Sequence, residues 1–180
     1  MENCSSQPAV PCATSNERRA LFAGSFDPFT IGHADIVRRA LLLFDKVFVV
    51  VAVNPAKHYL FTADERVDAI RSLYQRESRV EVVAYEGMMA DLASQVGARF
   101  VVRGVRSVID FEYEKVEADF NKRLGGLETV LLYSSPSLAS VSSTAYRQLV
   151  FFHKDAEAAA LLPSTAEPCP SLKRGAIGKC

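Results

Sequence analysis

The feature that most constrains the fold is an almost unbroken apolar run, KVFVVVAV, at residues 46–53. A strand with one wet face alternates apolar and polar residues, whereas this run offers no polar face after its first residue. Such β-branched runs are typical of a strand that is covered on both sides inside a parallel sheet. Because parallel strands need crossover connections, the run also predicts helices between the strands. An α/β protein is therefore expected.

Strands and helices are predicted to alternate along the rest of the chain. Apolar runs predict strands at 20–23, 46–53, 80–84, 100–102 and 129–133. Amphipathic spacing and helix-end signals predict helices at 32–44, after a capping box formed by Thr62 and Glu65, and at 88–96, 110–124 and 143–152. Strict alternation with short connections predicts a doubly wound, five-stranded parallel sheet. In such sheets, ligands bind outside the carboxyl ends of the strands.

Composition constrains the domain organisation and the partners. The chain has 180 residues, 49% of them hydrophobic, which suits one domain at 19–163, with a disordered N-terminal extension at 1–18 and an irregular tail at 164–180. Lys plus Arg and Asp plus Glu both number 21, a balance that argues against nucleic-acid and membrane-surface partners. Neither a spanning segment nor a signal peptide is evident, so we expect a cytoplasmic protein. The four cysteines lie near the chain ends at spacings that match no zinc site.

The segment AGSFDPFTIGH, residues 23–33, leaves the first expected strand and enters a helix. Gly24 permits close approach of the backbone, Pro28 and Gly32 shape the turn, and the first helical amides point towards the ligand crevice. This arrangement favours a polyphosphate ligand. It matches neither the Walker loop nor the GxGxxG motif, which disfavours an ordinary ATPase or dehydrogenase. From the residues alone, His33 is equally compatible with a helix cap and with a catalytic group.

The stretch GSFDPFTIGH resembles the first signature of the nucleotidyltransferase superfamily, H/T-x-G-H, and its GSFDP form is similar to the phosphopantetheine adenylyltransferase family. Four further stretches agree in order and spacing: NPAK at 54–57, RGVR at 103–106, DFEYE at 110–114 and VSST at 141–144. The resemblance covers residues 19–163. It implies a Rossmann-like nucleotidyltransferase fold and a homohexamer. It also implies transfer of the adenylyl group of ATP to 4′-phosphopantetheine in coenzyme A biosynthesis, with Mg²⁺ held mainly by the ATP phosphates.

The implied reaction accounts for the residue types present. A phosphate monoester is already anionic at neutral pH, so its attack on the α-phosphate needs no general base. The site must instead align two polyanions and stabilise charge at the phosphorus during transfer. Cations, hydroxyls and helix amides supply these effects, and no catalytic carboxylate pair or triad is evident in the sequence.

The resemblance also assigns individual roles. It places His33 at the α-phosphate as a transition-state stabiliser and names Lys57 and Arg106 as the other catalytic residues. The residues assigned to 4′-phosphopantetheine are Ser25, Lys57, Met89 and Arg103. The residues assigned to ATP are Ser25, Phe26, His33, Gly104, Val105, Arg106, Glu114, Leu138, Ala139, Ser140, Val141, Ser142, Ser143 and Thr144. No protein ligand for the metal is nominated.

Simpler interpretations stay open beside these roles. Lys57 is compatible with a solvated surface lysine, Met89 with core packing, and Ser142 with a plain helix N-cap. Asn54 departs from the family, which often has serine or threonine there, and two prolines after residue 163 interrupt the stretch where the family continues into a helix. Two other functions also remain: a related transferase acting on nicotinate mononucleotide or an alcohol phosphate, and a non-catalytic nucleotide-binding module.

Overall fold

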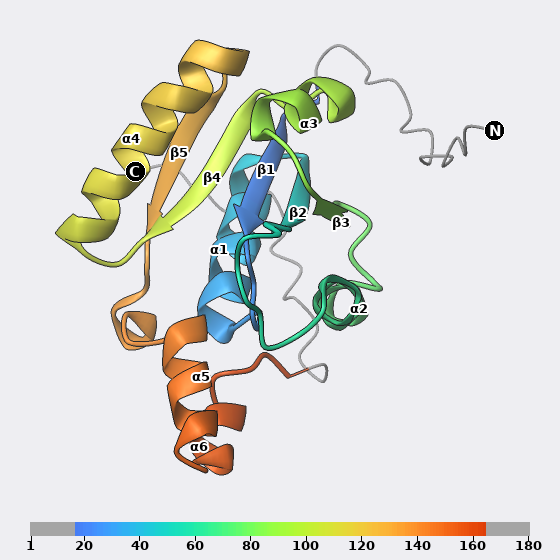
Figure 1. Cartoon of the computed structure of the whole chain (residues 1–180). Helices are drawn as coiled ribbons and strands as arrows, with labels where there is room; N and C mark the ends of the chain where they lie inside the picture. The colour runs from blue at the N-terminus through green and yellow to red at the C-terminus, as the bar shows by residue number, and fades with distance from the viewer. Residues whose placement is uncertain (1–16, 165–180) are drawn as a thin grey trace, which may run out of the picture.

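A five-stranded sheet with only parallel pairs forms the middle layer of the structure, a computed structural model that describes residues 17–164 (Figure 1). Its strands are β1 (Arg19–Gly24), β2 (Lys46–Ala52), β3 (Val80–Tyr85), β4 (Phe100–Val105) and β5 (Glu128–Tyr133). The spatial order is β3-β2-β1-β4-β5, which confirms the predicted doubly wound α/β fold. The expected terminal extensions lie outside the described residues, apart from residues 17, 18 and 164, and so do all four cysteines.

Helices connect the strands and complete the layers on both sides of the sheet. They are α1 (Ile31–Leu43), α2 (Ala63–Leu73), α3 (Met89–Val96), α4 (Val108–Gly125), α5 (Ser143–Phe151) and α6 (Asp155–Ala159), with a 3₁₀ turn at Pro136–Leu138. The first five helices were predicted: α2 begins directly after its expected N-cap Thr62, and the ends of the other four are displaced by no more than two residues. The 3₁₀ turn and α6 were not, because such short elements leave no periodic pattern. Within residues 17–164, no helix is both long enough and apolar enough to cross a membrane.

The apolar run of β2 is buried on both faces, as its composition predicts. Val47, Val49 and Val51 belong to the core cluster under α1 and α2. Phe48 and Val50 point the opposite way, into the cluster under α3. All five side chains are fully buried. Burial of alternate side chains on two faces is what makes this strand apolar throughout, and it sets β2 inside the sheet.

Strand β4 is longer than predicted, and this changes the position of the RGVR stretch. The sequence predicts a strand at 100–102, but pairing with β5 continues through Arg103↔Leu131 to Val105↔Tyr133. Arg103 therefore lies within the strand and only Arg106 follows it. The strand continues past Arg103 because its charged side chain has polar partners in the pocket, the carbonyl of Ala23 and the carboxylate of Glu114.

The sheet opens between β1 and β4. These strands pair only at Ala20↔Phe100 and Leu21↔Val101, so their carboxyl ends separate. On either side of this gap the chain runs outwards in opposite directions, towards β3 and towards β5. Such a topological switch point is where open α/β sheets bind ligands. The geometry therefore locates the candidate site before any side chain is considered.

Candidate active site

A pocket of about 300 Å³ lies at the carboxyl ends of β1 and β4. The loop after β1, the start of α1, the end of β4, one residue of α4 and the segment leading into α5 form its walls. Twelve residues assigned from the resemblance meet there: Ser25, Phe26, His33, Arg103, Gly104, Arg106, Glu114, Leu138, Val141, Ser142, Ser143 and Thr144. Stretches that are far apart in the sequence thus share one cavity.

Five assigned residues do not line this pocket. Val105 is buried at the end of β4. Ala139 and Ser140 lie exposed in the turn before α5. Met89 begins α3 and packs partly against the core cluster under that helix. Lys57 is exposed on the loop between β2 and α2.

The loop after β1 takes its shape from Phe26 rather than from a glycine of positive φ. Phe26 itself has a φ of 48°, in the left-handed region that non-glycine residues rarely adopt. Its ring lies so close to Gly24 that a Cβ there would be 2.8 Å from Cε1 of Phe26. The ring also lies 5.0 Å from that of His33, edge to face. Gly24 is therefore required so that Phe26 can form the wall behind His33.

His33 combines the two roles that the sequence left open. Its Nδ1 accepts a hydrogen bond from the backbone N–H of Thr30 at 3.0 Å, which caps α1. A ring whose Nδ1 accepts carries its proton on Nε2, so Nε2 is a donor in the neutral form. Burial, with the positive charge of Arg106, lowers the pKa of His33 from 6.5 to about 4. At neutral pH, the side chain is thus an uncharged hydrogen-bond donor with a fixed tautomer.

Arg103 bridges the opening between the strands. Its Nη1 donates to the carbonyl oxygen of Ala23 at 2.9 Å, and its Nη2 donates to Oε1 of Glu114 at 2.8 Å. Nε pairs with the other oxygen of Glu114, which makes the contact bidentate. Arg106 lies further out and pairs with Asp110 at 3.1 Å. One guanidinium is therefore fixed between β1 and α4, while the second lies near the rim.

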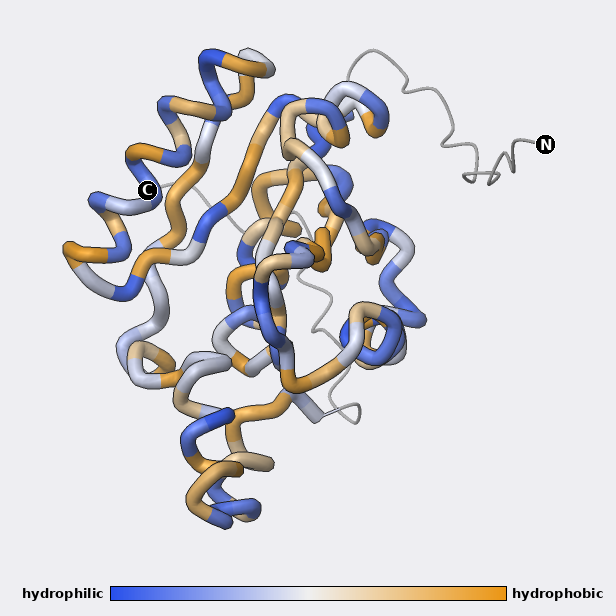
Figure 2. Tube along the Cα trace, in the orientation of Figure 1, coloured by the Kyte–Doolittle hydropathy of each residue, from blue (hydrophilic) through white to orange (hydrophobic). Residues whose placement is uncertain are grey.

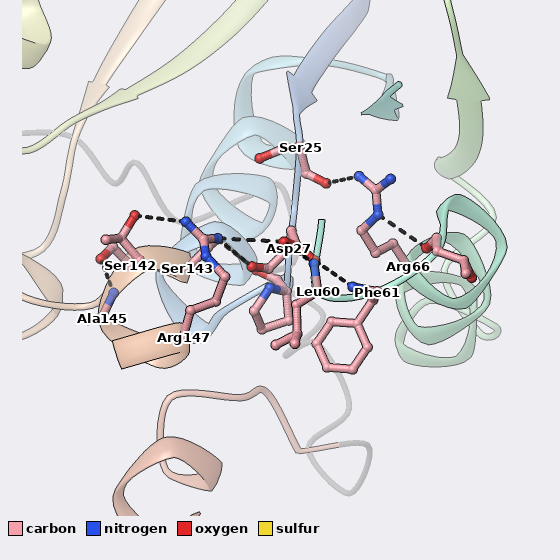
Figure 3. Close-up of polar contacts among 12 residues, drawn as sticks. Ser25, Asp27, Leu60, Phe61, Arg66, Ser142, Ser143, Ala145 and Arg147 are labelled. Carbon is pink, nitrogen blue, oxygen red and sulfur yellow. Dashed lines mark hydrogen bonds and ion pairs between the residues drawn. The ribbon is translucent and has the colours of Figure 1, made fainter. Parts of the chain in front are cut away.

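The N-terminus of α5 forms the opposite wall (Figure 3). Ser142 caps this helix by accepting from the N–H of Ala145 at 3.0 Å, and Ser143 Oγ donates to the carbonyl of Pro28 at 2.8 Å. Arg147 also lines the pocket, although the sequence analysis did not assign it. It lies four residues after Ser143, one helical turn on, and this spacing is the signal that could have identified it. Hydroxyls, helix amides and a guanidinium together suit an anionic ligand.

The donor set does not fit a protein-bound metal ion. Among residues 17–164, no group of three or more His, Cys, Asp or Glu side chains could hold one. Glu114 is the acidic residue that lines the pocket, and both its oxygens face Arg103.

Comparison with known proteins agrees with the geometry. The sequence profile of the cytidylyltransferase-like family matches residues 21–149, so the chain is a nucleotidyltransferase of this class. Phosphopantetheine adenylyltransferases from Bacteroides fragilis and Porphyromonas gingivalis are 47% and 48% identical over 138 and 136 residues. These alignments cover 77% and 76% of this chain and 92% and 89% of the relatives. The chain belongs to the phosphopantetheine adenylyltransferase family.

A solved structure supports the fold independently. The bifunctional NMN adenylyltransferase/ADP ribose pyrophosphatase from Francisella tularensis superposes with a TM-score of 0.63 at 15% identity. The match covers 83% of this chain and 46% of that chain. At this level of identity, the likeness extends to the nucleotidyltransferase fold alone.

The environment of His33 predicts its titration. In the ligand-free protein, we expect His33 to remain neutral as the pH falls through 6.5 and to become protonated only near its pKa of about 4. Since an unfolded histidine binds a proton near pH 6.5, the folded state loses stability relative to the unfolded state between these values, and the loss levels off below pH 4. NMR titration of the imidazole signals, with His33 assigned through a His33→Gln variant, measures this directly. A titration midpoint near 6.5 for His33 would contradict the lowered pKa and the desolvated environment that causes it.

Proposed function

We propose that this chain transfers the adenylyl group of ATP to 4′-phosphopantetheine, giving dephospho-coenzyme A and pyrophosphate. The observation that carries the proposal is the pocket between β1 and β4, which joins a neutral His33 donor to the N-terminus of α5 and to arginine side chains. A phosphate oxygen of the acceptor attacks the α-phosphorus of ATP. The bond from this phosphorus to the bridging oxygen breaks, and pyrophosphate leaves with the electron pair.

His33 acts in this mechanism as a donor and not as a base. Its Nδ1 is occupied by the N–H of Thr30, and a pKa of about 4 makes the ring a poor proton acceptor at neutral pH. The Nε2 proton is therefore directed at a non-bridging oxygen of the α-phosphate. This hydrogen bond strengthens as negative charge develops, so it lowers the barrier more than it improves ATP binding.

The leaving group and the acceptor are held by different parts of the protein. Ser142, Thr144 and Arg147 at the start of α5 bind the β- and γ-phosphates, and Arg106 adds a further positive charge. On the acceptor side, Arg103 and Lys57 bind the phosphate of 4′-phosphopantetheine. The fixed position of Arg103 in the last part of β4 supports this role. Lys57 is supported by the position of its loop at the carboxyl end of β2, which pairs with β1.

Magnesium enters the proposal as an ion carried mainly by the ATP phosphates. This division is supported by the chemistry of Mg²⁺, which dehydrates reluctantly and keeps phosphate and water ligands. The ion would neutralise part of the triphosphate charge. We also propose a cytoplasmic location for the reaction, where ATP is available.

The assembly that we propose is a homohexamer in which α4 contributes to contacts between copies. One face of this helix carries five apolar side chains, each half or more exposed: Ile109, Tyr113, Val116, Phe120 and Leu124. Figure 2 shows hydrophobic residues, in orange, alternating with hydrophilic ones along α4. The spacing of the five side chains, three or four residues, places them on one side of the helix. A contiguous group of exposed apolar side chains is typical of a protein interaction surface.

The exposed face of α4 predicts the effect of a charge on assembly. Phe120→Asp places a carboxylate in this stripe, so we expect it to reduce the molar mass found by light scattering after gel filtration. Asp119→Asn, on the adjoining side of the same helix, serves as the matched control and should leave the mass unchanged. A wild-type chain that is monomeric at micromolar concentration would contradict the proposal.

The acceptor and the nucleotide can be tested with one assay of pyrophosphate release. We expect rapid release from ATP with 4′-phosphopantetheine, and little release with nicotinate mononucleotide, or with phosphocholine and CTP. Turnover of another acceptor in place of 4′-phosphopantetheine would instead identify a related transferase. Binding of ATP without pyrophosphate release from any acceptor would identify a non-catalytic module.

Removal of the His33 side chain should affect turnover more than binding. We expect His33→Ala to lower kcat by on the order of 10²-fold, because the lost hydrogen bond is strongest in the transition state. The affinity for ATP, measured by calorimetry, should change much less. Circular dichroism controls for the lost cap of α1. Equal losses in kcat and in ATP affinity would contradict the donor role.

A further inference from the structure

Asp27 is a buried carboxylate that the reaction, as described above, does not use. It belongs to the GSFDP stretch and is only 2% exposed. A charged side chain at such depth is costly unless hydrogen bonds compensate it. Its partners therefore indicate why the loop after β1 contains an acid.

Both carboxylate oxygens of Asp27 bind the loop that carries Lys57. We call residues 53–62, between β2 and α2, the Lys57 loop. Oδ2 accepts from the N–H of Leu60 at 2.9 Å, and Oδ1 accepts from the N–H of Phe61, also at 2.9 Å (Figure 3). These amides immediately precede Thr62, the N-cap of α2. The negative charge thus lies at the positive end of the α2 dipole, which stabilises it further.

The turn that holds Lys57 is organised mainly by contacts inside its own loop. Asn54 forms the turn, since its Oδ1 accepts from the N–H of Ala56 and its carbonyl accepts from the N–H of Lys57, both at 2.9 Å. The hydroxyl of Tyr59 then accepts from the N–H of Asn54 at 3.0 Å. This accounts for asparagine at position 54, because it closes the turn with its side chain. Such local contacts shape the loop but do not fix its distance from the pocket.

Among the described residues, hydrogen bonds from two side chains connect the Lys57 loop to the loop after β1. One is Asp27. The other is the buried Arg66 of α2, whose Nη1 donates to the carbonyl of Ser25 at 2.6 Å while its guanidinium lies 4.1 Å from the centre of the Tyr59 ring. Asp27 is therefore the residue of the loop after β1 whose side chain reaches the Lys57 loop.

The same residue reaches α5 through its backbone. The carbonyl oxygen of Asp27 accepts from Nη1 of Arg147 at 2.7 Å, and Nη2 of that arginine donates to Thr144 Oγ1 at 3.2 Å. The carboxylate lies further from this guanidinium, at 3.7 Å. Figure 3 shows Asp27 between the two sides. Its main chain thus serves the proposed triphosphate side, with a longer ion pair from the carboxylate, and both hydrogen bonds of its side chain serve the proposed acceptor side.

We propose that Asp27 is a positioning residue that sets the place of the Lys57 loop relative to bound ATP, and so aligns the acceptor phosphate with the α-phosphorus. The inference rests on the proposed function. Transfer between two phosphates needs the attacking oxygen in line and within contact distance, and errors of about 1 Å are costly. A carboxylate can accept from two adjacent amides at once, whereas a carboxamide has one accepting oxygen.

The substitution Asp27→Asn acts mainly on the acceptor side. It keeps the backbone carbonyl that accepts from Arg147 at 2.7 Å, but it removes the charge, and with it the longer ion pair to Arg147, and one of the two acceptors for the loop amides. We expect the KM for 4′-phosphopantetheine to rise by on the order of tenfold, as loss of a hydrogen bond to a charged group implies. The affinity for ATP, measured by calorimetry, should change less than about threefold, a split that a general loss of stability would not produce.

Asp45→Asn is the matched control. Asp45 also accepts from a backbone N–H, that of Arg18 at 3.0 Å, and pairs with that arginine, but it precedes β2 at the opposite end of the sheet. We expect this variant to lose stability without any change in the acceptor KM. The double variant Asp27→Asn with Lys57→Ala should have nearly the same acceptor KM as Lys57→Ala alone. Both changes remove the same contribution to acceptor binding, that of the positioned Lys57 side chain.

Hydrogen exchange adds a measurement on the unmodified protein. The amides of Leu60 and Phe61 should each exchange at least about tenfold more slowly than that of His58. Asp27→Asn should abolish this protection for one of the two amides, because the carboxamide has only one accepting oxygen. If Asp27→Asn does not fold, Asp27→Glu, which keeps the charge but displaces the carboxylate, takes its place with the same expected rise in KM.

The possible failures are distinguishable. A wild-type chain without turnover of 4′-phosphopantetheine would overturn the proposed function and this inference with it. An active wild type whose Asp27 variant keeps a normal acceptor KM, or loses ATP affinity equally, would overturn only the inference. Additive effects of the Asp27 and Lys57 substitutions on the acceptor KM would also overturn only the inference.

Discussion

The separation of β1 from β4 is the constraint on which the rest of the site depends. The two strands share only two paired positions, so the carbonyl of Ala23 has no strand partner across the gap. The Arg103 side chain replaces the missing strand partner and donates to this carbonyl at 2.9 Å. The same bond thus satisfies a half-buried acceptor and fixes a cation at the mouth of the crevice. Glu114 of α4 then orients the guanidinium. The gap between the strands thus determines where the cation of the site lies.

Desolvation has a similar double effect at His33. The aromatic rings of Phe26 and Phe29 lie 5.0 and 5.4 Å from the imidazole and pack against it. Desolvation is the main cause of the low pKa of His33, and it would also strengthen the hydrogen bond that Nε2 donates in the proposed mechanism. The cap to Thr30 selects the tautomer. A residue that looked from the sequence like either a cap or a catalyst is suited to donation because it is a cap.

The sequence predicted what regular patterns encode. The run of β2 required burial on two faces, and the alternation of elements then required the parallel sheet and the position of its crevice. It did not predict the φ of Phe26, because the contact with Gly24 that accompanies it depends on how the loop closes. It also ended β4 too early at Arg103, where pairing with β5 outweighs the local cost of a charge.

Contacts between distant residues were the least predictable from the sequence. Asp27 lies 33 and 34 residues from the amides that it binds, and Arg147 lies 120 residues from the carbonyl of Asp27. No periodicity carries such information. These contacts show how a chain with no net charge could hold the two polyanions of the proposed reaction. The guanidinium groups of Arg103, Arg106 and Arg147 are each oriented by a neighbouring carboxylate or carbonyl, so local orientation replaces overall charge. In the proposed site, the acids Glu114 and Asp27 thus orient the donors rather than the substrates.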